Sequence, residues 1–341
     1  PPPHCFEVWI NELRLNGFNE QGGYAGLARV DIKLADLGNI SLAGNYTSIG
    51  WGSLDQKLIQ RQREEIIQYD LSTNLELGKL LPEKMGLRVP FYAQYANVTK
   101  NPEYDPYDLD IKLKDKIRNE SDPAKKAEIR TLAQDVTVVR GFNFTNVRKE
   151  RRGKGAPMPW DISNFSLTYA YNQQHKRDPF TIRNDQNRYK GSLDYQYATG
   201  LQPIQPFKKV DNKYLKFIKE LNLNPLPNTY GFNTTLERYV GVRTDRFAGE
   251  DPKRNTYYNR RFTWDRNYDL GWDITRSLRF NFDATARSLI DEPLQYDNDG
   301  SEISSGSRRD SIFKGLRNLG RPKNYTHNSS LNYTLPFKYI P

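Results

Sequence analysis

The strongest constraint in the sequence is a two-residue alternation of apolar and polar side chains that recurs along most of the chain. In residues 67–77, Ile, Tyr, Leu and Thr alternate with Gln, Asp, Ser, Asn and Glu. Side chains of a β-strand point to opposite faces in turn, whereas a helix would spread these apolar residues around its circumference. Residues 67–77 therefore predict a strand with one apolar and one polar face.

The number and length of such segments narrow the fold class. We count about twelve of them, each roughly 10–13 residues long. Strands of soluble proteins are most often about 5–6 residues long, while a tilted membrane-spanning strand needs roughly 9–11. Long strands with opposite apolar and charged faces are expected between lipid and a water-filled lumen. The sequence therefore predicts an all-β chain, a segment of a large antiparallel transmembrane β-barrel with helical inserts in its loops.

Composition excludes several other classes. The mean hydropathy is −0.84, and no stretch of about 20 apolar residues is present, which excludes a helical membrane protein. Aromatic residues make up 13% of the chain, too many for a disordered protein. The net charge of +10 is scattered along the chain, so we expect no nucleic-acid partner. With one Cys and three His and no recognisable nucleophile, we expect neither an enzyme nor a cofactor.

The connections between these strands alternate in length. Residues 35–39 and 275–278 are expected to be tight turns, whereas residues 49–65, 98–135, 174–187, 241–260 and 290–323 are long and polar. Outer-membrane barrels have short periplasmic turns and longer external loops. Short helices are expected in two inserts, 98–135 and 199–228. In the first, Ser121-Asp122-Pro123 is a helix-start signal, and in the second residues 212–221 are amphipathic.

We expect residues 1–341 to form part of one barrel domain that is incomplete by itself. The chain begins with Pro1 without Met or a signal peptide and stops at Pro341, which predicts a segment of a longer or processed chain. Trp51, Trp160 and Trp264 are expected near strand ends, where an aromatic girdle lies.

Candidate site residues follow from the polar face of the predicted strands. Asp297, Asp299 and Ser301 have the spacing of a calcium loop, but the later bidentate Glu is missing, so a solvated external loop is the favoured interpretation. No other metal site is expected. The residues expected to face the lumen are Arg29, Asp31, Lys33, Asp70, Glu76, Lys190, Asp194, Asp269 and Asp273.

Several motifs carry a family resemblance. Residues 7–15 (EVWINELRL) run into FNEQGGY at 18–24, and GWGSLDQK at 50–57 and LGKLLPEKMG at 77–86 follow. Together with NPEYDP at 101–106, they resemble the SprA (Sov) family, giant outer-membrane translocons of the type 9 secretion system of Bacteroidota. The resemblance is most specific over residues 7–110 and weaker beyond about residue 200.

The resemblance implies a wall segment of a protein-translocation pore that passes folded cargo across the bacterial outer membrane and is associated with gliding motility. It implies several partners: outer-membrane lipid, secreted cargo proteins, a PorV-like barrel and a Plug-like protein. The alternative from the residues alone is a soluble or surface-exposed β-rich protein that binds carbohydrate or protein through exposed aromatic side chains.

Overall fold

One large antiparallel sheet dominates the structure. The computed structural model describes residues 22–57, 60–151, 153, 158–199, 203–207, 222–246, 255–293 and 304–334. The strands are β1 (Ala25–Lys33), β2 (Gly38–Thr47), β3 (Glu64–Glu76), β4 (Leu87–Arg88), β5 (Pro90–Pro102), β6 (Tyr104–Asp105), β7 (Asp108–Lys112), β8 (Asp135–Lys149), β9 (Phe165–Arg177), β10 (Thr181–Ala198), β11 (Thr229–Asp245), β12 (Thr256–Asp273), β13 (Leu278–Leu289) and β14 (Arg321–Tyr333). The helices are α1 (Leu113–Asn119), α2 (Pro123–Ala133) and α4 (Ser305–Arg317), with short 3-10 turns η1 (Ala35–Leu37), η3 (Leu77–Leu80), η4 (Glu83–Met85) and η5 (Ile162–Asn164).

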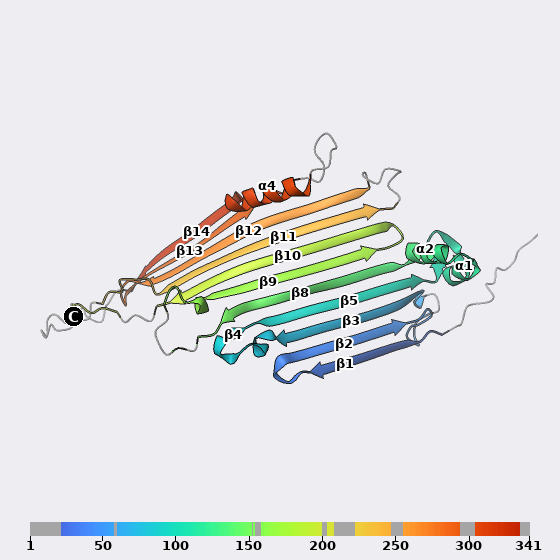
Figure 1. The fold of residues 1–341 in the computed structure, drawn as a ribbon, viewed down its shortest axis with the longest axis horizontal. Coiled ribbons are helices and arrows are strands. Elements are labelled where there is room, and N and C mark those ends of the chain that lie inside the picture. The colour runs from blue at the N-terminus through green and yellow to red at the C-terminus, as the bar shows by residue number, and fades with distance from the viewer. Residues whose placement is uncertain are drawn as a thin grey trace, which may run out of the picture.

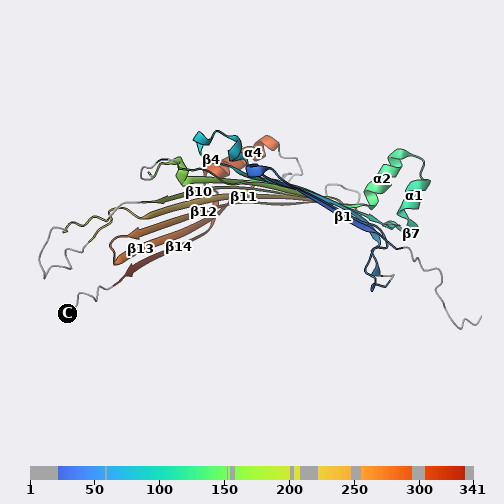
Figure 2. The same ribbon diagram turned by 90° about the horizontal axis from the view of Figure 1, so that it is seen from below.

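The sheet is twelve-stranded, in the order β1-β2-β3-β5-β8-β9-β10-β11-β12-β13-β14, with β4 attached to β8. Each strand on this path follows its spatial neighbour in the chain, and every pair is antiparallel. The expected antiparallel β-structure with few helices is thus confirmed. Among the described strands the sheet does not close, because β1 and β14 lie at its two open edges (Figures 1 and 2).

The connections divide between two ends of the sheet. At one end, which we call the turn end, lie the links β1–β2, β3–β5, β8–β9, β10–β11 and β12–β13; the other links lie at the loop end. The expected turns at 35–39 and 275–278 are present, the second closed by two backbone hydrogen bonds between Thr275 and Leu278, of 3.1 and 3.3 Å. In the first turn Gly38 has φ +143° and lies against Asn74, so a Cβ there would meet the Asn74 backbone.

One expected loop is a strand pair instead. Residues 174–187 were expected to be a long polar loop, but β9 runs to Arg177 and β10 begins at Thr181, so only residues 178–180 form the turn. Asp178 organises it by accepting hydrogen bonds from the amides of Phe180 and Thr181. The prediction was wrong because both faces of this part of the strand pair are polar, which removes the apolar alternation on which it depended.

Helices occupy the connections rather than a second layer. In the 98–135 region, α2 begins at Pro123 with Asp122 as its N-cap, whose side chain accepts a hydrogen bond from the Ala124 amide (2.9 Å). The helix expected at 212–221 lies outside the described residues. No helix in the described part of the chain is long and apolar enough to cross a membrane.

Burial is sparse for a chain of this size. Few hydrophobic side chains of the described residues are buried, among them Leu113 and Ala133 in the α1–α2 insert and Ile290 after β13. Many apolar side chains on the strands remain exposed, Leu331 at 63% and Leu167 at 52%. The described sheet is therefore a single layer without a closed hydrophobic core of its own. Both of its faces can contact solvent or other molecules.

Candidate functional site: two opposite faces of one sheet

All nine residues expected to face a lumen carry their side chains on the same face of the sheet. Directly paired residues of antiparallel strands share a face, and alternate residues of each strand return to it. The register runs from Arg29, Asp31 and Lys33 through β2 to Asp70 and Glu76, then through β5, β8 and β9 to Lys190 and Asp194, and through β11 to Asp269 and Asp273. We call this side of the sheet the polar face.

Most charges on the polar face have a partner beside them. Asp31 accepts hydrogen bonds from Arg29 (2.8 Å) and from Ser41 on β2 (2.6 Å). Asp70 accepts one from Gln68 (2.9 Å), and Glu76 accepts one from the Val89 amide (2.6 Å). These contacts hold acidic side chains flat against the sheet within a hydrogen-bonded network.

The same pattern continues across the second half of the polar face. Asp194 accepts hydrogen bonds from Ser192 and Asn233, and Asp273 pairs with Arg279. Lys190 lies opposite Glu237 in the register. The charged residues among them include both signs, so the polar face has a mixed charge at these positions. Each exposed pair contributes only about 0–1 kcal/mol to stability.

One pair on the polar face departs from this complementarity. Asp269 on β12 lies directly opposite Asp283 on β13. Like charges directly across a ladder are destabilising. Asp269 also approaches Gly231 on β11 so closely that a Cβ there would meet its carboxylate at 2.9 Å. Repulsion between Asp269 and Asp283 therefore destabilises the sheet in the middle of the polar face.

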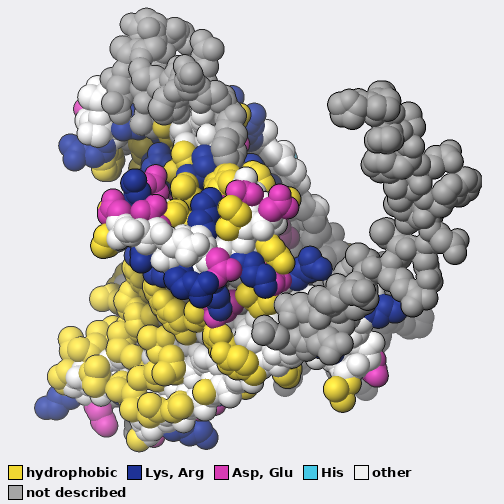
Figure 3. Space-filling model, turned by 90° about the vertical axis from the view of Figure 1, so that its right-hand side faces the viewer, with side chains coloured by type: hydrophobic (Ala, Val, Ile, Leu, Met, Phe, Trp, Pro, Cys, Tyr) yellow, Lys and Arg dark blue, Asp and Glu magenta, His cyan; other side chains and the backbone are white. Residues whose placement is uncertain are grey.

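The opposite face is rich in aromatic and branched aliphatic side chains, and we call it the apolar face. Aromatic rings meet across neighbouring strands, with centroids 4.9 Å apart for Phe91–Phe144 and for Tyr171–Tyr189. Figure 3 shows hydrophobic side chains gathered in a continuous patch, apart from a region rich in charged side chains. Members of the apolar face include Val30, Ile32, Leu42, Leu71, Tyr95, Phe142, Leu193, Phe232, Tyr268, Phe282 and Leu331.

The apolar residues form a band that crosses the strands obliquely. From Leu42 on β2, the register passes through Leu71, Tyr95, Arg140, Gln173, Asn187 and Val240 to Arg260 on β12. On β12 the apolar stretch is instead centred near Tyr268, eight positions further (268 − 260 = 8). At about 3.3 Å per residue and about 4.8 Å per strand, this offset over seven strand spacings inclines the band by about 40° from the perpendicular to the strands. We call this stripe the apolar band.

Beyond the apolar band, toward the loop end, the same face becomes polar. His175 Nδ1 lies 2.5 Å from the Asp185 carboxylate, and Arg140 donates a hydrogen bond to Gln173. Arg238 pairs with Glu292. At this level both faces of the sheet carry hydrophilic side chains, which is what a strand surrounded by water requires.

The insert between β5 and β8 is fixed to the β9–β10 turn. The buried Asp105 carboxylate pairs with the Lys116 ammonium and accepts a hydrogen bond from the Tyr107 amide (3.1 Å). The Tyr107 hydroxyl donates to the Pro179 carbonyl oxygen (2.6 Å). Burial raises the pKa of Tyr107 above its usual value; Arg246 opposes this shift, and the Asp105 and Asp178 carboxylates add to it. The insert therefore stands over the loop end of the sheet.

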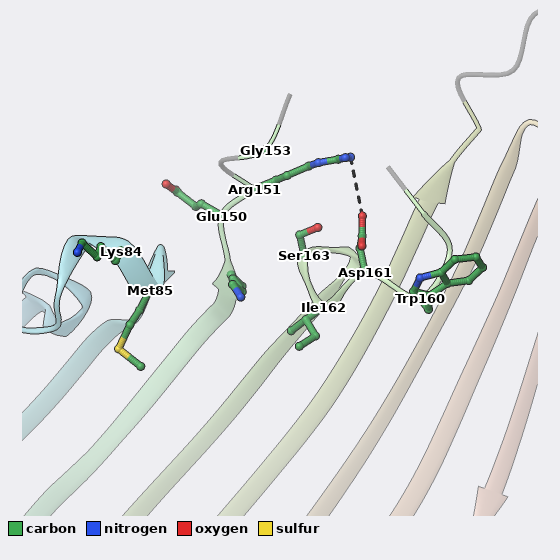
Figure 4. A pocket seen from close by; sticks show the side chains of 10 residues that line it. Lys84, Met85, Glu150, Arg151, Gly153, Trp160, Asp161, Ile162 and Ser163 are labelled. Carbon is green, nitrogen blue, oxygen red and sulfur yellow. Dashed lines mark ion pairs between the residues drawn. The ribbon is translucent and has the colours of Figure 1, made fainter. Parts of the chain in front are cut away.

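A pocket of about 550 Å³ opens at the turn end. Lys84 and Met85 come from η4, Arg151 follows β8, and Trp160 and Asp161 precede β9 (Figure 4). Arg151 points toward Asp161, with an N–O distance of 3.9 Å. The lining mixes basic and acidic groups, so its charges favour neither an anionic nor a cationic ligand.

The Trp residues do not form the expected pattern throughout. Trp160 is 76% exposed at the turn end, and Trp51 is exposed in the β2–β3 loop. Both positions are near strand ends, as expected. Trp264 lies in the middle of β12 instead, and its indole donates a hydrogen bond to Thr234 (2.6 Å). Trp272, at the turn end of β12, bonds the Asn224 carbonyl. The prediction for Trp264 was wrong because β12 extends well beyond the apolar stretch.

The weak calcium candidates, Asp297, Asp299 and Ser301, lie outside the described residues. Within the described residues, no group of three or more His, Cys, Asp or Glu side chains has a geometry that could hold a metal ion.

Residues 2–117 match the SprA_N family model, which is described as a motility related/secretion protein. The predicted resemblance is thus confirmed over this range, and a secretion and motility family is consistent with a place in the cell envelope. No curated protein matches the chain.

The SprA_N match ends inside α1, not at a boundary of the sheet. Within the described residues it contains β1, β2, β3 and β5, which carry Arg29, Asp31, Lys33, Asp70 and Glu76. Its last large strand, β5, pairs with β8 over Phe91–Lys100, and the sheet continues to β14. The strands within the matched range and the strands beyond it therefore form one continuous sheet with the same two faces.

Proposed function

We propose that this chain forms part of the wall of a protein-secretion pore in the bacterial outer membrane, with the apolar band against lipid and the polar face toward a water-filled lumen. The observation that carries the proposal is the division of one single-layered antiparallel sheet into these two faces. The SprA_N match supplies the secretion and motility context.

The obliquity of the apolar band supports this orientation. Strands of membrane barrels are tilted by about 35–45° from the membrane normal, so a layer of lipid is inclined by that same angle from the perpendicular to the strands. The apolar band has the same inclination, about 40° from that perpendicular. The polar ends beyond the band then lie in water on the loop side, while the turn end faces the periplasm.

In this role the chain acts as a passive surface rather than an enzyme. Closure of a barrel removes unpaired strand edges, so β1 and β14 need further strands beside them. The mixed charge of the polar face limits the retention of cargo of either sign. Outer-membrane lipid, secreted cargo, a PorV-like barrel and a Plug-like protein are the partners in this proposal.

The experiment uses neighbouring residues on opposite faces. In the full-length protein in cells, with other reactive thiols replaced, Asp283→Cys on the polar face and Phe282→Cys in the apolar band are treated with a bulky, membrane-impermeant maleimide. We expect rapid labelling at position 283, with reduced cargo export, and little labelling at position 282. Equal labelling of both positions would indicate a water-exposed sheet and favour a soluble binding protein. Labelling of position 283 without any effect on export would contradict the pore role.

A further inference from the structure

The helix α4 and the segment before it rest on the apolar face beyond the apolar band. After β13, the Ile290 amide donates a hydrogen bond to the Phe262 carbonyl of β12 (2.9 Å), and the Ile290 side chain is 3% exposed. Glu292 pairs with Arg238, whose side chain belongs to the apolar face. Gly315 of α4 approaches Ile290, because a Cβ on Gly315 would lie 3.1 Å from the Ile290 side chain. Thus α4 is held on the apolar side of the sheet.

The figures agree with this placement. Figure 2 shows the sheet as an arch with α4 on its convex side, and Figure 1 shows α4 beside β12–β14. Because α4 contacts Ile290 on the apolar face, the apolar face is the convex face there. In a barrel wall the convex face is the outer one. The helix therefore lies outside the wall, at the level where the apolar band ends.

The exposed side of α4 combines positive charge with one large aromatic side chain. Residues 305–317 contain four basic residues and one acidic residue. Arg309, Phe313 and Arg317 are four residues apart and form one exposed stripe, in which Phe313 is 61% exposed. Ile312 and Leu316 are only partly exposed, as is Gly315, which lies beside Ile290. Among the described residues, no carboxylate forms an ion pair with Arg309, Lys314 or Arg317.

Such a stripe is suited to the boundary between lipid headgroups and water. An interfacial helix inserts apolar side chains among the upper acyl chains and places basic side chains among anionic headgroups. Each basic residue near an anionic membrane surface contributes about 1 kcal/mol. Phe313 between two Arg residues fits this arrangement, and Tyr325, on the apolar face of neighbouring β14, is 58% exposed and continues the apolar surface below the helix.

We propose that α4 is a membrane-contact helix that binds phosphate-bearing lipid headgroups of the membrane surrounding the wall, with Phe313 inserted between them. This inference rests on the proposed function, since the lipid contact of α4 continues that of the apolar band.

Site-specific photocrosslinking in cells that produce the full-length protein tests it. The photoreactive residue p-benzoylphenylalanine replaces Phe313 on α4, Phe282 in the apolar band, or Asn328 on the polar face, and lipid adducts are identified by mass spectrometry. We expect phospholipid or lipid A adducts at positions 313 and 282 and none at position 328. Adducts at 282 but not at 313, or a protein adduct at 313, would overturn the role of α4 and leave the proposed wall intact. Failure at 282 would count against the proposed function itself.

A charge-reversal pair tests the headgroup contact. With the crosslinker at position 313, Arg309→Glu combined with Arg317→Glu is expected to lower the lipid-adduct yield at least about fivefold. The matched control, Arg308→Glu on the less exposed side of α4, is expected to lower it by less than about twofold. Equal yields from both variants and the parent would overturn the proposed charge contact.

Discussion

Arg238 on β11 and Glu292 beyond β13 form a two-bond ion pair, with Nε–Oε1 at 2.6 Å and Nη2–Oε2 at 2.9 Å. The Glu292 side chain is 4% exposed and that of Arg238 is 38% exposed. The pair fixes the segment after β13 to the apolar face near the loop end of the sheet. Because the Glu292 carboxylate is buried, its charge depends on the neighbouring Arg238 guanidinium for compensation.

Removal of that guanidinium should loosen the segment. Arg238→Gln leaves the Glu292 carboxylate buried without a counter-ion, which we expect to cost about 2 kcal/mol, because water still reaches the Arg238 side of the pair. Amide hydrogen exchange at Ile290 should become roughly tenfold faster or more. Arg321→Gln is the matched control, since its partner Asp291 is exposed, and it should change exchange little. Equal exchange in the two variants would show that the buried pair does not hold the segment.

A positive charge in the apolar band should impair assembly in the membrane. Phe282→Arg places a guanidinium where we expect lipid, at a cost of about 2–4 kcal/mol near the midplane. The neighbouring residue 283 is expected to face the lumen, and Asp283→Arg removes the charge repulsion between Asp269 and Asp283. This variant should therefore assemble at least as well as the parent. Heat-modifiable migration of the full-length protein in gels reports assembly. Equal assembly of both variants would refute the lipid contact of the band.

The charge balance of the polar face should matter for transport. Combining Asp70→Lys, Asp194→Lys and Asp269→Lys makes the face strongly basic, and acidic cargo should be retained, with export slowed several-fold. Basic cargo should be exported at the parent rate or faster. The exposed loop substitution Asp55→Lys adds charge away from the face and serves as control. Unchanged export of acidic cargo in the triple variant would rule out a role for mixed charge.

The buried carboxylate of the insert should depend on Lys116. Lys116→Met removes the cation from Asp105, whose side chain is 2% exposed, and should destabilise the α1–α2 insert by about 2 kcal/mol. Hydrogen exchange across residues 103–134 should rise while exchange in β9 stays unchanged. Lys112→Met is the comparison, because Lys112 and its partner Glu103 are more exposed (N–O 3.3 Å). If Lys112→Met has the larger effect, the proposed anchor is incorrect.

The insert should also respond to high pH through Tyr107. Burial raises the pKa of its hydroxyl, so the neutral form is favoured in the folded state. The stability from its hydrogen bond to Pro179 is therefore fully present below the unfolded pKa of about 10 and is lost as pH rises through the folded value. The absorbance difference at about 295 nm between the parent and Tyr107→Phe should titrate above pH 10. A midpoint at or below the ordinary value would contradict the burial of this hydroxyl.

The sequence predicts this structure best in the segments where apolar and polar side chains alternate every two residues. In 67–77 every second residue is apolar or Thr, and β3 has the expected two faces. All nine lumen candidates share one face for the same reason, because a strand returns each side chain to the same side every two residues. The strand ends at 174–187 were missed, since polar residues on both sides leave no period to detect. Only the pairing of His175 with Asp185 and its neighbours across the ladder shows that these residues are strands.

The sequence by itself determined the antiparallel, two-faced character of the strands, because a two-residue period requires no partner to be recognised. The similarity of residues 2–117 to SprA_N was recognisable in the same way, from local motifs. The tertiary structure alone decided the oblique path of the apolar band and the attachment of α4 to the apolar side. Both depend on register between strands and on contacts such as Arg238–Glu292 and Gly315–Ile290, which join residues 54 and 25 positions apart. No local pattern encodes such contacts, because they arise only when the whole sheet is aligned.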